Sequence, residues 1–292
     1  MKTLLILLIL VSMVFSFACS GSNNPTNPNP NPDPDPDPDP VSNQNIPGNF
    51  YSEIIDETYL TMLSLPDNYN ANDPQGYHVV FVFDAEELFA IADASITTLS
   101  NLGTILPTIL IGIRNPSMEA RARDFTYPRR RAVDNNSGGG ENYYQFLKTE
   151  LLPFIDSAFN TQGQHGRTLI GWSLTAQYTL WNLFKYRPGS EPLLFKNYLP
   201  IAPGALNWAE DNIFTMEESM SQAINNNLPA NIYITIGSTE TDLMDYWLRM
   251  DSVLDLRNYN NYNYSDSIYP GLNHRSVRQP SITDGLEWFF GL

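Results

Sequence analysis

The chain has 292 residues, with 16 Lys and Arg against 32 Asp and Glu, so its formal net charge is −16. This acidic balance argues against nucleic-acid binding, because contacts with phosphate groups require a basic surface. The single Cys excludes a disulfide scaffold and a Cys-based zinc site, and three His leave little room for a His-rich metal centre. We therefore expect no metal and no cofactor. Hydrophobic residues make up 42% of the chain, which is enough for a sizeable core.

Residues 1–18 have the pattern of a secretory signal peptide. Lys2 precedes an uncharged apolar run that ends at Ala18 and is too short to span a bilayer as a stable helix. The only cysteine, Cys19, follows at once, and the segment resembles a bacterial lipoprotein signal in which that Cys becomes the acylated N-terminus. We expect a lipid anchor in a membrane outside the cytoplasm, and Ser20 favours the outer membrane or cell surface. Plain signal-peptide cleavage beside an incidental Cys is the alternative.

Residues 19–45 are expected to form a linker behind the lipidated Cys. Asn-Pro repeats are followed by Asp-Pro repeats, and alternating Pro is incompatible with a helix or a central strand. Such a segment favours extended polyproline II, and its four aspartates repel one another. We predict a stalk; a disordered tail without that role is the alternative. Without Lys2 and the four linker aspartates, 15 basic residues face 28 acidic ones, so residues 46–292 carry a net charge of −13.

Residues 46–292 alternate strand and helix patterns. The segment 58–65 alternates apolar and polar residues, which predicts a half-buried antiparallel strand. The continuous apolar runs 78–83 and 108–113 are typical of parallel strands that are buried on both faces. Further strands are predicted at 168–171, 198–202, 231–236 and 267–269, and helices at 87–102, 142–159, 175–185, 241–259 and 282–290. This alternation predicts an α/β fold, a mostly parallel central sheet with helices on both faces. The Asn- and Tyr-rich segment 258–264 is expected to be a loop.

A candidate nucleophile lies where a predicted strand turns into a helix, in Gly171-Trp172-Ser173-Leu174-Thr175. This is most of the G-x-S-x-G nucleophile elbow, in which a strained turn exposes the Ser hydroxyl above the carboxyl ends of the strands. Thr175 stands where that pattern has its second Gly, and a β-branched side chain crowds the turn. We predict that Ser173 is the nucleophile; an ordinary strand–helix turn is the alternative.

The Ser–acid–His order of α/β-hydrolases requires a histidine after Ser173, and His274 is the only such histidine in the sequence. His274 lies between the last predicted strand and the last predicted helix, where an imidazole can reach the carboxyl edge of the sheet. We predict that it takes the Ser173 proton and returns it to the leaving alcohol; a surface histidine is the alternative. His78 and His165 stand at the starts of strands, at the opposite edge, and are expected to be structural.

The acid of the triad should follow the predicted strand 231–236. We choose Glu240 to orient His274, and Asp242 and Asp245 are the alternatives. Acidic residues are also common in the first turn of any helix. The oxyanion formed in the reaction needs two backbone N–H donors. One is predicted to be Leu174, and the other should come from the loop after the strand 78–83.

With these residues in this order, the chain resembles a family of α/β-hydrolase esterases. The family includes siderophore, feruloyl and acetyl-xylan esterases, S-formylglutathione hydrolases and mycolyltransferases. The resemblance covers about residues 50–292. It is carried by Val82-Phe-Asp-Ala-Glu86, Ile111-Gly-Ile-Arg-Asn115, Arg123-Asp-Phe-Thr-Tyr-Pro128, the segment from Gly139 to Asp156, Gly171-Trp-Ser173, Gly237 to Glu240 and Asn273-His274. The resemblance implies that the second oxyanion donor is the backbone N–H of Glu86. Thr175, Ala85 and Gly204 depart from the family pattern.

Residues for substrate recognition are less clearly marked. Five arginines fall in one predicted loop: Arg121, Arg123, Arg129, Arg130 and Arg131. They are consistent with a clamp for an anionic or catecholate substrate, with Arg129 and Arg130 as our choices, or with surface salt bridges. Trp172 and Trp208 are candidates for stacking on sugar or phenolic rings, although aromatic residues more often belong to the core.

The leading hypothesis is a serine esterase outside the cytoplasm. It would hydrolyse a carboxylic ester, either carbohydrate-linked (acyl or feruloyl) or a siderophore ester, through an acyl-enzyme. The alternatives are a ligand- or glycan-binding lipoprotein without activity on the same fold, and an acyltransferase. The expected partners are a small-molecule or glycan ester and, through the lipid anchor, a membrane. We expect a monomer.

Overall fold

The computed structural model describes residues 46–128, 136–204 and 210–292. The predicted signal peptide (1–18), Cys19 and the predicted linker (19–45) lie outside the described residues. Arg129, Arg130, Arg131 and Trp208 lie outside them as well.

Eight strands form one sheet in the order β1-β2-β4-β3-β5-β6-β7-β8. The strands are β1 (Gly48–Ser52), β2 (Glu57–Ser64), β3 (His78–Val82), β4 (Thr108–Arg114), β5 (Arg167–Trp172), β6 (Asn197–Ile201), β7 (Asn231–Gly237) and β8 (Asn263–Tyr269). The strand β2 pairs antiparallel with both β1 and β4, and the other ladders are parallel. Parallel pairing brings the carboxyl ends of β3 to β8 to one edge of the sheet, where ligands of open α/β sheets bind.

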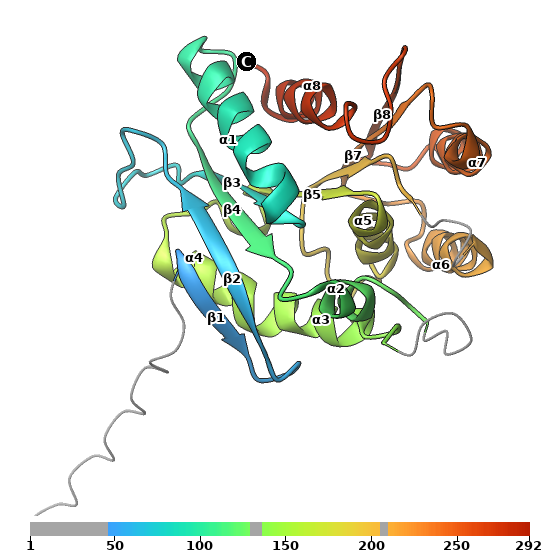
Figure 1. Cartoon of the computed structure of the whole chain (residues 1–292), viewed down its shortest axis with the longest axis horizontal. Coiled ribbons are helices and arrows are strands. Elements are labelled where there is room, and N and C mark those ends of the chain that lie inside the picture. Colours follow the sequence, from blue (N-terminus) through green and yellow to red (C-terminus); the bar gives the residue numbers. More distant parts are fainter. Residues whose placement is uncertain (1–45, 129–135, 205–209) are drawn as a thin grey trace, which may run out of the picture. The chain divides into compact units, whose positions relative to one another are not determined.

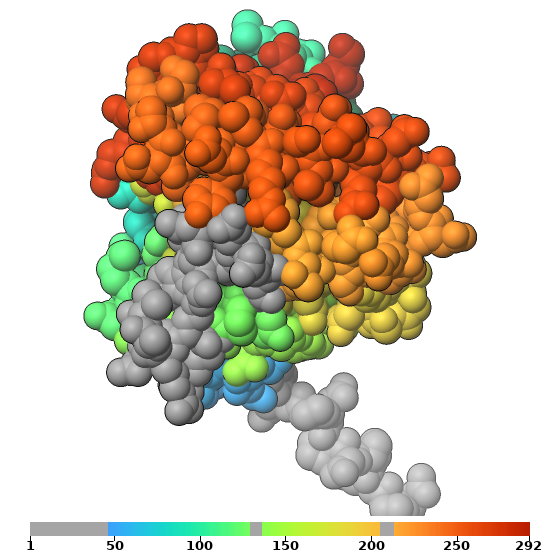
Figure 2. All heavy atoms as spheres, turned by 90° about the vertical axis from the view of Figure 1, so that its right-hand side faces the viewer, coloured from blue at the N-terminus to red at the C-terminus, as the bar shows by residue number. Residues whose placement is uncertain are grey.

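Helices cover both faces of the sheet. They are α1 (Ala85–Asn101), α2 (Met118–Asp124), α3 (Gly140–Phe146), which continues through a π-helical turn (Leu147–Leu151) into α4 (Leu152–Ala158), α5 (Leu174–Phe184), α6 (Glu210–Ala223), α7 (Thr241–Leu256) and α8 (Arg278–Phe290). Figure 1 shows α1 and α8 together on one side of the sheet and α3 and α5 on the other. Figure 2 turns towards the side of α6 and α7, whose residues cover much of that face. The predicted α/β architecture is confirmed.

The central strands are buried because each is covered on both faces. All six residues of β5 are buried, and so are all seven of β7 except Asn231. Beneath the carboxyl edge, four buried rings meet edge to face: Phe83, Phe125, Tyr143 and Tyr178. Such contacts add to the burial of the rings themselves. This aromatic cluster packs the loop after β3 firmly against α5.

Three sequence predictions need correction. The last strand is longer than predicted, because β8 begins at Asn263, inside the segment 258–264 that we expected to be a loop. The strand β1 and the helices α2 and α6 were not predicted. Arg121 and Arg123 were assigned to a loop but lie in α2, which begins after Ser117, whose hydroxyl accepts a hydrogen bond from the Ala120 N–H. Within 46–128, 136–204 and 210–292, no helix is long and apolar enough to span a bilayer.

Candidate active site

Ser173 lies on a sharp turn between β5 and α5. Its backbone has φ 61° and ψ −120°, a left-handed conformation that a residue with a side chain adopts only at a cost of about 1–3 kcal/mol. The surrounding structure holds this turn: the Ser173 N–H donates to the Ile201 carbonyl at 3.0 Å, and its carbonyl accepts from the Ala176 N–H at 3.1 Å. The turn therefore has the geometry of a nucleophile elbow, and Ser173 is half-buried at its tip.

Two glycines, Gly171 and Gly204, allow close packing around this turn, because a side chain at either position would overlap its neighbours. A Cβ at Gly171 would lie 2.3 Å from the Thr175 carbonyl oxygen, so only Gly lets β5 and α5 approach this closely. A Cβ at Gly204 would lie 2.8 Å from the Ser173 hydroxyl. Gly204, which departs from the family pattern, therefore leaves the space beside the Ser173 hydroxyl open.

His274 and Glu240 meet at the same edge of the sheet. The Nδ1 atom of His274 lies 2.5 Å from the Glu240 carboxylate, which is 5% exposed. The other oxygen of Glu240 accepts from the Gly237 N–H at 3.0 Å, so the carboxylate is fixed from both sides. Of the three acids considered from the sequence, Glu240 contacts His274, whereas Asp242 and Asp245 are exposed.

Trp172 holds the other side of His274. The Trp172 indole N–H donates to the His274 carbonyl at 2.7 Å, and the two rings pack with their centroids 4.9 Å apart. The Arg278 guanidinium lies over the Trp172 ring, 4.7 Å from its centre, and pairs with Glu87 at 2.5 Å. Trp172 is only 8% exposed. From the sequence, Trp172 was a candidate for stacking on the substrate, whereas in the structure it packs against His274. The sequence did not suggest a role for Arg278.

Ser173, Glu240 and His274 line one hollow of about 480 Å³. The other residues that line it are Gly204, Thr239, Thr241, Asp242, Leu243 and Asn273. Hydroxyl, amide and carboxylate groups are present around the candidate nucleophile, while carbon atoms supply about half of the exposed lining. The hollow can therefore accept a ligand that has both polar and apolar parts.

The start of α1, which follows β3, supplies the second candidate oxyanion donor. Glu86 is the second residue of α1 and Leu174 is the first residue of α5. Backbone N–H groups in the first turn of a helix have no partner within that helix, and the helix dipole there favours negative charge. Both N–H groups predicted from the sequence therefore belong to helix starts at the carboxyl edge of the sheet.

Arg121 and Arg123 do not form a clamp at this site. Arg121 makes a bidentate ion pair with the buried Asp84, at 2.6 and 2.7 Å. Burial alone would lower the pKa of Arg121, but its bonds to Asp84 raise it above its ordinary value, so the guanidinium stays charged. Arg123 pairs with the buried Asp124 at 2.7 Å. Both arginines compensate buried carboxylates, which fits the salt-bridge alternative considered from the sequence.

His78 and His165 lie away from the candidate site, as predicted. His78 begins β3, and its ring packs against Phe290 with centroids 4.5 Å apart. Burial lowers the pKa of His78 below its ordinary value. His165 lies in a short 3-10 turn just before β5. Both residues stand at the amino ends of the strands.

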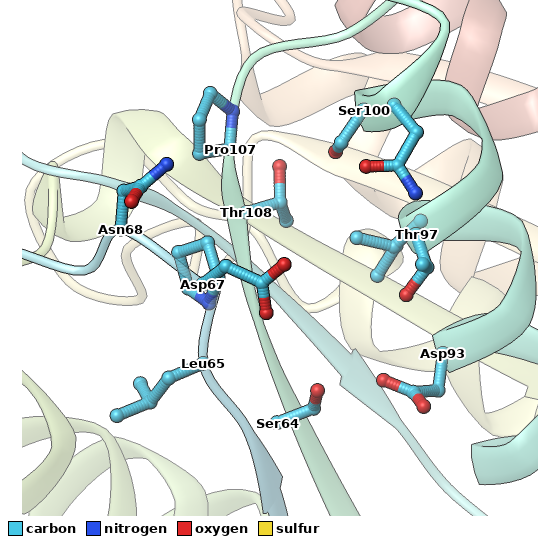
Figure 3. A pocket seen from close by; sticks show the side chains of 12 residues that line it. Ser64, Leu65, Asp67, Asn68, Asp93, Thr97, Ser100, Pro107 and Thr108 are labelled. Carbon is cyan, nitrogen blue, oxygen red and sulfur yellow. The ribbon is translucent and has the colours of Figure 1, made fainter.

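A second hollow, of about 380 Å³, lies between the end of β2, α1 and the start of β4 (Figure 3). Asp67 and Asp93 contribute carboxylates to it, and Ser, Thr and Asn side chains surround them. Its 12 lining residues include no histidine. It lies at the opposite end of the parallel strands from Ser173 and has no general base of the kind that the first hollow holds.

The fold and the turn at Ser173 define the class of protein, the α/β-hydrolases. The family model described as "Putative esterase" matches residues 52–289, and the chain therefore belongs to this esterase family. No curated protein matches the chain at a significant level.

Solved structures share the fold at low sequence identity. The BES protein from Bacillus cereus is 23% identical, with a TM-score of 0.73 over 84% of this chain and 94% of that one. An IroE-like serine hydrolase from Shewanella oneidensis is 22% identical, with a TM-score of 0.71 over 83% of this chain and 78% of that one. The siderophore hydrolase EstB from Aspergillus nidulans is 17% identical, with a TM-score of 0.69 over 83% and 94%.

Proposed function

We propose that the protein is a serine esterase that hydrolyses carboxylic esters through an acyl-enzyme. One observation carries the proposal: the 2.5 Å contact of His274 with Glu240 lies in the same hollow as Ser173, which stands on a strained elbow. A Ser activated by a base that is itself oriented by a third group is the arrangement of nucleophilic acyl transfer. Membership of the esterase family supports it.

Each residue has a distinct role in this proposal. His274 takes the proton of the Ser173 hydroxyl as that oxygen attacks the ester carbonyl, and then gives it to the leaving alcohol. Glu240 keeps the imidazole in the orientation and tautomer that this requires, and stabilises its protonated form. The N–H groups of Leu174 and Glu86 stabilise the negative oxygen of the tetrahedral intermediate. Water then attacks the acyl-enzyme, and His274 acts as base again.

Two substrate classes have support. The Thr239, Thr241 and Asn273 side chains in the hollow could hydrogen-bond an ester whose alcohol part carries hydroxyl groups, such as an acylated or feruloylated carbohydrate. Likeness to structures described as siderophore hydrolases supports a siderophore ester instead. Arg129 and Arg130 remain candidates for binding an anionic substrate. With the lipid anchor expected at Cys19, the enzyme would act outside the cytoplasm, at the outer membrane or cell surface.

Labelling with a fluorophosphonate tests the proposal. The purified wild-type protein and the Ser173→Ala variant are treated with the probe, and the intact mass of each is measured. We expect one adduct on the wild type and none on the variant. No adduct on folded wild-type protein would contradict the proposal and favour a binding protein without activity. Assays with acetylated sugars, feruloyl sugars and siderophore esters, with and without an added alcohol acceptor, then separate the substrate classes and distinguish hydrolysis from acyl transfer.

A further inference from the structure

The carboxylate of Asp84 is the centre of a buried hydrogen-bond network next to Ser173. Asp84 is 2% exposed and precedes α1 with a left-handed backbone, φ 50°. Its side chain does not cap the helix. Instead, one oxygen accepts from Arg121 at 2.6 Å and from the Asn115 amide at 2.6 Å, and the other accepts from Arg121 at 2.7 Å and from the Thr175 hydroxyl at 2.9 Å. The network therefore joins the start of α1, the loop after β4, α2 and the elbow.

Thr175 connects this network to the turn that carries Ser173. Its side chain is fully buried, and its hydroxyl oxygen accepts from the Trp172 N–H at 2.9 Å. The hydroxyl has one proton and two acceptors at 2.9 Å, Asp84 and the Trp172 carbonyl. The ionised carboxylate is the stronger acceptor, so the proton is directed to Asp84. Gly, the usual residue of the pattern at this position, makes none of these bonds.

The same network holds both segments that carry the candidate oxyanion donors. Leu174 lies directly before Thr175 in the chain, and Glu86 lies two residues after Asp84. The Asn115 amide bonds both Asp84, at 2.6 Å, and the Glu86 carboxylate, at 2.9 Å.

Arg121 compensates the negative charge of the Asp84 carboxylate in this network. An unpaired carboxylate this close to the elbow would oppose the negative charge that develops on the substrate oxygen. The bidentate pair with Arg121 compensates the charge of Asp84 and leaves the carboxylate available as a hydrogen-bond acceptor.

We propose that Thr175 and Asp84 are positioning residues that set the separation of the two oxyanion donors, the N–H groups of Leu174 and Glu86. The inference rests on the proposed esterase function. Neither side chain touches the substrate in this proposal; both act through the backbone segments that they join. The departure of Thr175 from the family pattern is then a functional feature of this chain.

Variants of Thr175 in the full-length protein test this proposal. Thr175→Val keeps the shape of the side chain and removes the hydroxyl, and Thr175→Ser restores the hydroxyl. Loss of one oxyanion donor typically costs 10²–10³-fold in kcat, and misalignment of a donor should cost part of that. We expect Thr175→Val to lower kcat for p-nitrophenyl acetate about 10- to 100-fold with KM within about threefold, and Thr175→Ser to recover most of the loss. The pH profile of kcat/KM should stay unchanged, because His274 and Glu240 are untouched.

Thr179→Val is the matched control. Its hydroxyl is also buried on α5, one turn further on, and donates to the Thr175 carbonyl at 2.9 Å rather than to the network. We expect its kcat to equal that of the wild type. Equal kcat in folded Thr175→Val, or an equal loss in Thr179→Val, would overturn the proposal.

Two further measurements separate the ways in which the test can fail. If the wild type takes no fluorophosphonate, the proposed function fails before any variant is compared. If the wild type is labelled and Thr175→Val does not fold, Asn115→Ala replaces it, because Asn115 is only half-buried and bonds both Asp84 and Glu86. We expect Asn115→Ala to lower kcat about tenfold at constant KM; an unchanged kcat would refute the inference.

Discussion

The substitution Gly237→Ala should impair catalysis from a position outside the proposed triad. Gly237 ends β7, and a Cβ there would lie 2.3 Å from the Leu272 carbonyl oxygen and 3.1 Å from the Glu240 carboxylate. The Leu272 carbonyl cannot yield easily, because it already accepts from the Thr239 N–H at 3.1 Å and from the Thr239 hydroxyl at 2.9 Å. The added methyl group therefore pushes apart the two loops that carry Glu240 and His274.

The size of the effect follows from the overlap. An ordinary carbon–oxygen contact is about 1 Å longer than the 2.3 Å separation, so the loop two residues before His274 must move by roughly that amount. A misplacement of about 1 Å in a catalytic group can cost on the order of 10²-fold in rate. Overpacking of this kind also costs about 1–3 kcal/mol of stability. We expect kcat to fall about 100-fold and the variant to remain folded.

The assay compares kcat for p-nitrophenyl acetate and the melting temperature of Gly237→Ala with those of Gly271→Ala. Gly271 lies in the same loop as Leu272 and has φ 72°, but a Cβ there would meet nothing within 4 Å. Gly271→Ala should therefore lose stability through backbone strain and keep its kcat. If folded Gly237→Ala kept kcat within about threefold of the wild type, the claim that this contact fixes His274 would be wrong.

Three other predictions concern the proposed triad and a distant histidine. Ser173→Ala and His274→Ala should each lower kcat by several orders of magnitude, and near-normal turnover in either would contradict the assignment. Glu240→Gln should lower kcat far more than Asp242→Asn, and the reverse order would make Asp242 the acid. Burial lowers the pKa of His78 below 6.5, so the unfolded chain takes up the proton first and stability falls as the pH drops below that value. In urea unfolding at pH 7 and pH 5, His78→Gln should lose less stability on acidification than the wild type; an equal loss would exclude His78 as a cause.

The sequence was sufficient to predict the strands that are buried on both faces. Uninterrupted apolar runs such as 78–83 leave few alternatives, and the structure places β3 there. The strands at the two edges of the sheet were harder to predict, because they are partly exposed to solvent and their sequences need not form the continuous apolar runs of buried strands. The strand β8 has the sequence Asn-Tyr-Ser-Asp-Ser-Ile-Tyr, and none of its residues is fully buried. The same reason explains the missing prediction of β1, in which only Phe50 and Ser52 are buried.

For the candidate site, the order of residues in the chain predicted the Ser and His, but the sequence did not predict which side chains contact each other. Motif and order selected Ser173 and His274, which the structure places in one hollow. The roles of Arg121 and Trp172 could not be predicted, because their partners are distant in the chain: Asp84 lies 37 residues from Arg121, and His274 lies 102 residues from Trp172. In the sequence, Thr175 only appeared as a β-branched residue at the position of the second Gly of the elbow pattern. Its hydrogen bonds in the structure give a physical reason for a Thr at this position.

The sheet order also gives the two halves of the site unequal support. Ser173 follows β5, which has a neighbouring strand on each side, whereas His274 follows β8, which stands at the edge of the described sheet beside β7. Local opening of a fold starts at its least buried elements, and none of the residues of β8 is fully buried. Partial unfolding would therefore separate the proposed base from the serine while the central strands still hold together.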